Sequence, residues 1–331
     1  MACNDLYLLS VDGAYLKTDA ILPFSSAVGE ICWQDIGTAQ VVLPATDENI
    51  RLIVPDKYFV VPNTNGTLYY CHSVKYTDDE LWVYGVEAKW LYSKRVIMEA
   101  LPSGDQSVYS EGMRIINTYA DFPFVQPNFG IATKSFAGLE YCSVWDFIDY
   151  IQKKCTYGST MQYNGIAKNA YFNCAAGLDQ TGYLRFSLME GTLKSYELTR
   201  SNKTYCNKVY ALGTDNVVET AVDGTPTIEY AAILDLRETY PREDGTSLAD
   251  YREAVANKAY MSLIARHSTE KLSKAVAAEG VLYPYNLGSL VTVAIPELGV
   301  VKACRITKMT AETTTSGNKL TAEFTAVRDI S

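Results

Sequence analysis

The chain has 331 residues and a formal net charge of −9, and 48% of its residues are apolar and 20% are charged. This length is typical of about two domains, and the apolar share excludes a globally disordered chain. The acidic balance argues against a dedicated nucleic-acid binder, which normally carries a basic surface. The 2 His leave little room for His-based catalysis, whereas Tyr is abundant, with 25 copies against 10 Phe.

The N-terminus lacks the pattern of a secretion signal. No basic residue precedes the first apolar stretch, and Asp5 and Asp12 interrupt it. No run of 18 apolar residues occurs, so no transmembrane helix is expected. We therefore expect folding in a cytoplasm, with the 8 scattered Cys as small buried side chains rather than disulfides.

Strand signals dominate the first part of the chain. Residues 67–76 alternate with period two, which places Leu68, Tyr70 and His72 on one apolar face of a half-buried strand. Asn65-Gly66 just before them is a hairpin turn signal. The strand candidates are residues 39–44, 58–61, 67–76 and 81–86. Their short, regular spacing predicts a small antiparallel barrel or sandwich.

The middle of the chain is mixed. Ser143-x-x-Asp146 is a capping box, and the apolar spacing after it predicts a helix near 144–155. Residues 171–174 and 183–187 read as strands of a small sheet beneath this helix. A second capping box, Ser247-x-x-Asp250, opens a longer helix near 248–266. The residues expected to stack on one face of that helix are Leu248, Tyr251, Val255, Ala259 and Leu263.

Residues 269–279 could extend this helix or form a strand, and periodicity leaves both open. After them, residues 290–295, 300–309 and 320–326 read as strands of a second antiparallel unit. The predicted fold class is α+β and β-rich. Two small antiparallel β units, N-terminal and C-terminal, flank a mixed α/β middle region.

A search for chemistry returns no dinucleotide, Walker, zinc-protease or nucleophile-elbow motif. His72 is expected to be a packed strand residue, and His267 a cation near a helix end. Carboxylate pairs such as Asp78 and Asp79 lie in polar turns, as expected of solvated surface. We predict no catalytic residue, no metal site and no cofactor, and therefore no enzyme.

Several stretches, taken in order, resemble the baseplate or tail-tip hub proteins of long-tailed bacteriophages, which are also the hub part of tail-associated lysins. The stretches are Leu81-Trp82-Val83-Tyr84-Gly85 continuing to Arg95-Val96-Ile97, then Asn207-Lys208-Val209-Tyr210-Ala211-Leu212-Gly213, then Arg237-Glu238-Thr239-Tyr240, and Tyr285-Asn286-Leu287-Gly288-Ser289-Leu290-Val291-Thr292-Val293. Ser289 stands where hubs usually have Asp. The resemblance spans nearly the whole chain.

The resemblance implies an N-terminal barrel domain at 1–97, an inserted α+β domain at 98–205, a connecting α+β domain at 206–280 and a C-terminal barrel domain at 281–331. It also implies a structural role in the virion, at the phage tail tip or baseplate, after assembly in the host cytoplasm. Three copies would form a ring that caps the tail tube, anchors the tape-measure protein and opens for genome ejection. Two related β units per chain would let threefold symmetry satisfy sixfold contacts.

The implied partners are further copies of the chain, a distal tail or tube-end protein, the tape-measure protein, and further tail-tip or receptor-binding proteins. DNA would pass through without specific binding. Arg95 and Arg305 occupy similar places in the two β units and are candidate ring contacts, although ordinary solvated arginines fit equally well.

Two other functions remain open from the residues. One is a receptor- or carbohydrate-binding tail protein, since Tyr157, Tyr163 and Tyr240 lie in looser stretches. The other is a cell-wall-degrading tail enzyme. That activity usually resides in an added C-terminal domain, which we do not expect here because the sequence ends at Ser331.

Overall fold

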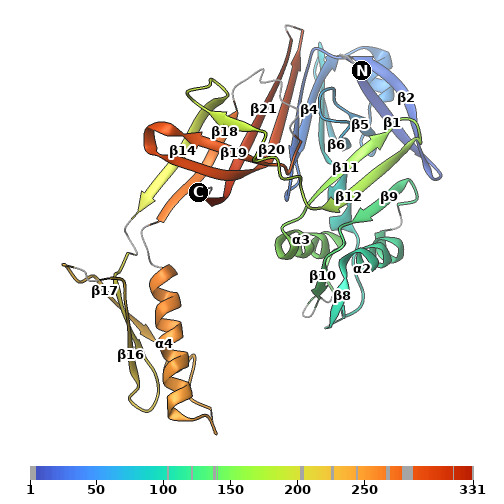
Figure 1. The fold of residues 1–331 in the computed structure, drawn as a ribbon. Coiled ribbons are helices and arrows are strands. Elements are labelled where there is room, and N and C mark those ends of the chain that lie inside the picture. Colours follow the sequence, from blue (N-terminus) through green and yellow to red (C-terminus); the bar gives the residue numbers. More distant parts are fainter. Residues whose placement is uncertain are drawn as a thin grey trace. The chain divides into compact units, whose positions relative to one another are not determined.

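The computed structural model describes residues 5–102, 104–120, 122–136, 139, 141–201, 205–224, 227–243, 245–265, 269–277, 286–315 and 317–329. The chain forms two compact units (Figure 1). Unit 1 combines Met1–Tyr196 with Lys274–Ser331, and unit 2 is Glu197–Ser273.

The N-terminal part of unit 1 is a run of antiparallel strands. Its elements are β1 (Asp5–Asp12), β2 (Tyr15–Pro23), β3 (Ser26–Cys32), β4 (Thr38–Pro44), α1 (Asp47–Leu52), β5 (Tyr58–Val60), β6 (Leu68–Tyr76) and β7 (Glu80–Glu87). The strands lie in the order β3-β4-β7-β6-β5-β1-β2. Apolar residues from strands along this order, such as Leu8 of β1, Val41 of β4 and Phe59 of β5, form one buried cluster.

The strands predicted at 67–76 and 81–86 are confirmed as β6 and β7, but the inward face of β6 differs from the expectation. A register shift between Cys71 and Ser73 marks a bulge, which reverses the side of the sheet that each following residue faces. Tyr69 and Cys71 are buried in the strand core, while Leu68 is buried on the opposite face in a second cluster. His72 is exposed, so its prediction as a packed residue is wrong.

The helical part of unit 1 follows β7. Its elements are η1 (Ala88–Lys94), β8 (Asp105–Ser107), α2 (Val108–Ile115), η2 (Ile116–Ala120), β9 (Val125–Phe129), β10 (Thr133–Ser135), α3 (Val144–Cys155), β11 (Gly158–Asn164) and β12 (Asn169–Ala175). The predicted capping box is confirmed in α3, where Ser143 and Asp146 cap each other's backbone N–H groups. Phe147, Ile148 and Ile151 of α3 are buried in the cluster that also holds Phe172 of β12.

The C-terminal part of unit 1 contains β13 (Arg185–Ser187), β19 (Leu290–Ile295), η3 (Pro296–Leu298), β20 (Val300–Thr314) and β21 (Gly317–Asp329). β14 (Leu193–Ser201) and β18 (Thr269–Ala277) pass between the two units. The open choice at residues 269–279 is resolved as a strand, because Ala275 of β18 pairs with Phe324 of β21. β13 pairs with β19 and does not join the β11-β12-β9 sheet, so the predicted small sheet containing residues 183–187 is wrong.

β20 joins the two β units directly. It pairs with β3 from Lys308 opposite Cys32 to Thr314 opposite Ser26, so all these strands form one 13-stranded sheet. In Figure 1 the long red strands run beside the blue N-terminal strands. The β-rich α+β class is confirmed. No closed barrel is detected among the described strands, so the two barrels stay a prediction.

Unit 2 is a three-stranded sheet with one long helix. β15 (Lys208–Leu212) lies between β16 (Val218–Val222) and β17 (Ala231–Asp235), and α4 (Leu248–Ala265) covers one face. Tyr251, Val255, Ala259 and Leu263 are buried as predicted. Leu248 is exposed instead, because it occupies the first helical position, next to Ser247, whose hydroxyl accepts the Asp250 N–H.

Candidate functional site

Trp33, just after β3, lies where three parts of unit 1 meet. Its backbone N–H donates to Thr307 O of β20 at 2.8 Å, and its carbonyl accepts the Ser159 N–H of β11 at 2.8 Å. The indole is buried against Gly158 and Gly288, and a Cβ at either glycine would come within 2.1–2.2 Å of the ring. The N-terminal strands, the helical part and the C-terminal strands are therefore fixed to one another around a single side chain.

A fully buried ion pair lies next to Trp33. Lys89 Nζ is 3.0 Å from Glu87 Oε2, and neither side chain is exposed. Lys89 Nζ also donates to the carbonyls of Cys32 at 2.7 Å and Ser159 at 2.9 Å. Glu87 Oε2 accepts the Gly37 N–H at 2.6 Å. The pair therefore links β3, the end of β7, η1 and β11.

Burial dominates the electrostatics of this pair. Desolvation raises the pKa of Glu87, and the Lys89 ammonium and the Gly37 N–H oppose that rise. Desolvation likewise raises the pKa of the neighbouring Cys32 thiol to about 12, which leaves it an unreactive thiol at neutral pH. Because both charges are enclosed, the chemistry of this cluster is structural: it can hold segments together, but it offers no surface to a substrate.

The two arginines singled out in the sequence both contact aromatic rings of their own chain. Arg95 follows η1, and its guanidinium lies 5.0 Å from the Phe122 ring centroid. Arg305 lies within β20, donates to Gly288 O at 2.7 Å and lies 5.8 Å from the Trp33 ring. Desolvation lowers the pKa of Arg305. The structure thus places them in different settings, one after a helical turn and one in a strand.

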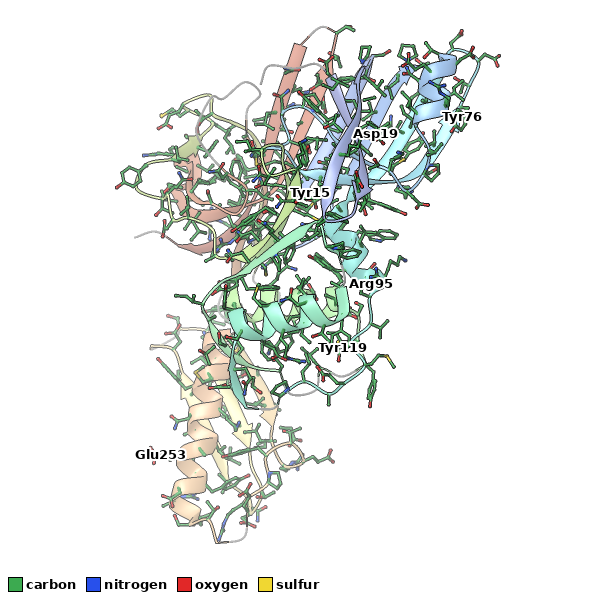
Figure 2. All side chains as sticks on the ribbon, turned by 90° about the vertical axis from the view of Figure 1, so that its right-hand side faces the viewer. Tyr15, Asp19, Tyr76, Arg95, Tyr119 and Glu253 are labelled. Carbon is green, nitrogen blue, oxygen red and sulfur yellow. The ribbon has the colours of Figure 1, made fainter. Side chains whose placement is uncertain are left out.

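β2 is the last strand in the order of the large sheet. Figure 2 shows Tyr15 and Asp19 on this strand. Tyr15 and Ile21 are exposed, and the Leu16 N–H donates to Lys168 O of the β11–β12 turn at 2.6 Å. A sheet edge of this kind presents backbone groups to which another strand could pair.

A hollow of about 710 Å³ in unit 1 lies between the β1-β2-β5 strands and the β11–β12 hairpin. It is lined by Tyr7, Thr18, Val60, Gly66, Gln162, Tyr163, Asn164, Gly165, Ile166 and Tyr171. A second hollow of about 370 Å³ shares Tyr7, Val60 and Gly66 with it. The two are therefore adjoining parts of one surface depression.

Within the described residues, no group of three or more His, Cys, Asp or Glu side chains could hold a metal ion. In the same part of the chain, no helix is long and apolar enough to cross a membrane. His267 lies outside the described residues. Sequence reasoning missed Trp33 and the Glu87–Lys89 pair. The available signal was two opposite charges inside the otherwise apolar stretch of residues 81–92.

No protein-family model matches the chain, and no curated protein matches it by sequence. Solved structures do match over nearly its full length. A tail protein from Neisseria meningitidis is 9% identical with a TM-score of 0.55, covering 97% of this chain and 96% of that one.

The 43 kDa tail protein of prophage MuSo2 from Shewanella oneidensis is 9% identical with a TM-score of 0.53, and the match covers 97% of this chain and 98% of that one. Prophage tail protein gp18 from Listeria monocytogenes is 10% identical with a TM-score of 0.51, and the match covers 96% of this chain and 94% of that one. At such low identity these likenesses establish a shared fold: the chain has the fold of these three tail proteins.

Proposed function

We propose that the protein is a structural hub of a phage tail tip or baseplate, located in the virion and without enzymatic activity. The observation that carries this proposal is the end-to-end likeness to three tail proteins, each covered over at least 94% of its own length. A match over whole chains supports a shared architecture rather than one shared domain.

In this proposal three copies form a ring that caps the tail tube. The β3–β20 pairing supports it, because it holds the two β units of one chain edge to edge. Three such chains would present six β units to a sixfold tube. In the assembled ring each β unit would form a barrel. The ring would anchor the tape-measure protein, contact the tube-end protein and open for genome ejection. Residues 1–97, 98–205, 206–280 and 281–331 would be its four domains.

Mass photometry of the purified chain, alone and with its tube-end partner protein, tests the ring. We expect a mass of three chains and a threefold ring in negative-stain images. Chains that remain monomeric at micromolar concentration with the partner present would contradict the proposal.

The same measurement tests the proposed ring contacts. Arg95→Ala should weaken the ring if Arg95 bridges copies, whereas Arg51→Ala, at an exposed position of α1, should not. Arg305 is half-buried, so Arg305→Lys is the better variant at that position. It keeps the positive charge but removes the planar guanidinium group and its paired hydrogen-bond donors.

A further inference from the structure

The 710 Å³ hollow of unit 1 has a lining that selects the chemistry of a ligand. Its volume falls in the range of about 300–1,000 Å³ that is usual for small-molecule sites. None of its ten lining residues is Asp, Glu, Lys, Arg or His. An ionic ligand would therefore lose its hydration without gaining a counter-charge.

The lining combines flat aromatic surface with polar groups. Tyr7, Tyr163 and Tyr171 supply rings, and Val60 and Ile166 add aliphatic surface. Tyr171 and Ile166 are exposed at 43% and 97%, so this surface is open to a ligand from solution. Large exposed apolar side chains gathered at one depression are typical of a binding site.

The polar groups are partly unused. Asn164 Oδ1 accepts the N–H groups of Ile166 and Ala167 at 3.1 Å each, which shapes the tip of the β11–β12 hairpin. No hydrogen bond among the described residues engages the Asn164 NH₂ group, the Gln162 side-chain amide or the Tyr171 hydroxyl. A purely apolar ligand would cover these groups without satisfying them, at a cost in free energy.

We propose that this hollow binds a neutral carbohydrate. A pyranose ring presents a face of C–H groups, which packs on Tyr rings, and hydroxyl groups around its rim, which exchange hydrogen bonds with the side chains of Gln162, Asn164 and Tyr171. A neutral sugar therefore matches both kinds of surface without bringing a charge into the hollow. All its lining residues come from one chain, so the hollow is formed without a residue of a second copy.

The test uses the full chain. We expect an array of neutral oligosaccharides to give hits, and saturation-transfer NMR to show ring-proton contacts for at least one of maltotriose, cellotriose and tri-N-acetylchitotriose. Tyr171→Ala should weaken the affinity for that sugar about tenfold, as loss of one aromatic contact predicts, and Gln162→Ala should weaken it too. Tyr183→Ala is the matched control, because Tyr183 is 88% exposed and lies outside the hollow.

Unchanged thermal melting of the Tyr171→Ala variant separates lost binding from lost folding. An array without a neutral hit overturns the proposal, and so does equal affinity of the Tyr171→Ala and Tyr183→Ala variants. A photo-crosslinker introduced as Ile166→p-benzoylphenylalanine gives a third outcome. Capture of a second copy or of a tail protein in the assembled particle would show that the hollow is a protein-docking surface, which also overturns the proposal.

Discussion

The buried Glu87–Lys89 pair gives the sharpest test of how unit 1 is held together. Lys89→Met removes the cation and leaves the Glu87 carboxylate without a counter-charge in a fully buried position. It also removes the donor that the carbonyls of Cys32 and Ser159 share. Glu87 Oε2 keeps the Gly37 N–H as a donor. The free energy of unfolding that this variant loses therefore measures the cost of burying one charge without its counter-charge.

The structure sets the magnitude. At 3.0 Å and an effective dielectric constant of about 20, the attraction amounts to about 5 kcal/mol. Part of it is offset by desolvation, and removal of one partner from a buried pair costs about 3–5 kcal/mol. We expect this loss in the free energy of unfolding for Lys89→Met. Glu87→Gln should cost less, because Lys89 retains two carbonyl acceptors. The double variant should recover much of the loss, because no unpaired charge remains.

The loss should depend on pH. Burial already raises the pKa of Glu87, and removing Lys89 raises it further. An acid whose folded-state pKa lies above its unfolded value destabilises the fold as pH rises between the two. Lys89→Met should therefore be closer to the parent at pH 5 than at pH 8.

Urea unfolding followed by Trp fluorescence measures this, since all four Trp (33, 82, 90 and 145) lie in unit 1. The control is Lys153→Met, which breaks the exposed pair with Asp149 and should cost less than about 1 kcal/mol. Equal small losses in Lys89→Met and Lys153→Met, or a loss independent of pH, would refute the reasoning.

Two further predictions concern single positions in unit 1. Gly288 has φ +83° and a Cβ there would lie 2.2 Å from Trp33, so Gly288→Ala should destabilise unit 1 by at least the ~1–3 kcal/mol of an overpacked site. Gly299 also has a positive φ of +68°, but a Cβ there would meet open space, so the stability lost in Gly299→Ala measures the backbone strain alone. If Gly288→Ala loses no more stability than Gly299→Ala, the clash with Trp33 is contradicted. Burial raises the pKa of Asp19, but hydrogen bonds from Lys57 and Ser10 outweigh it and lower the pKa below 3.8. The resulting stability is present above that value and is lost as the pH falls below it, so Asp19→Asn should make stability depend less steeply on pH on the acid side. An unchanged acid limb would contradict this reasoning.

The sequence by itself determined the elements whose signals are local. The capping box at Ser143 and Asp146 defined the start of α3, and apolar spacing identified its buried face. Period-two alternation located β6, and the Asn65-Gly66 turn signal lies between β5 and β6, which pair antiparallel. These signals succeed because a helical turn or a hairpin is stabilised by residues a few positions apart.

The tertiary structure alone decided what depends on distant partners. Residues 269–277 became a strand whose Ala275 and Val276 pair with β21, and β13 pairs with β19 rather than with β12, which is nearer in the sequence. The bulge after Cys71 exposed His72, and β20 found its partner in β3 some 280 residues earlier. Trp33 and Lys89 acquired their roles only when three segments closed around them. No local pattern encodes such contacts, because their free energy comes from surfaces that meet only in the folded chain.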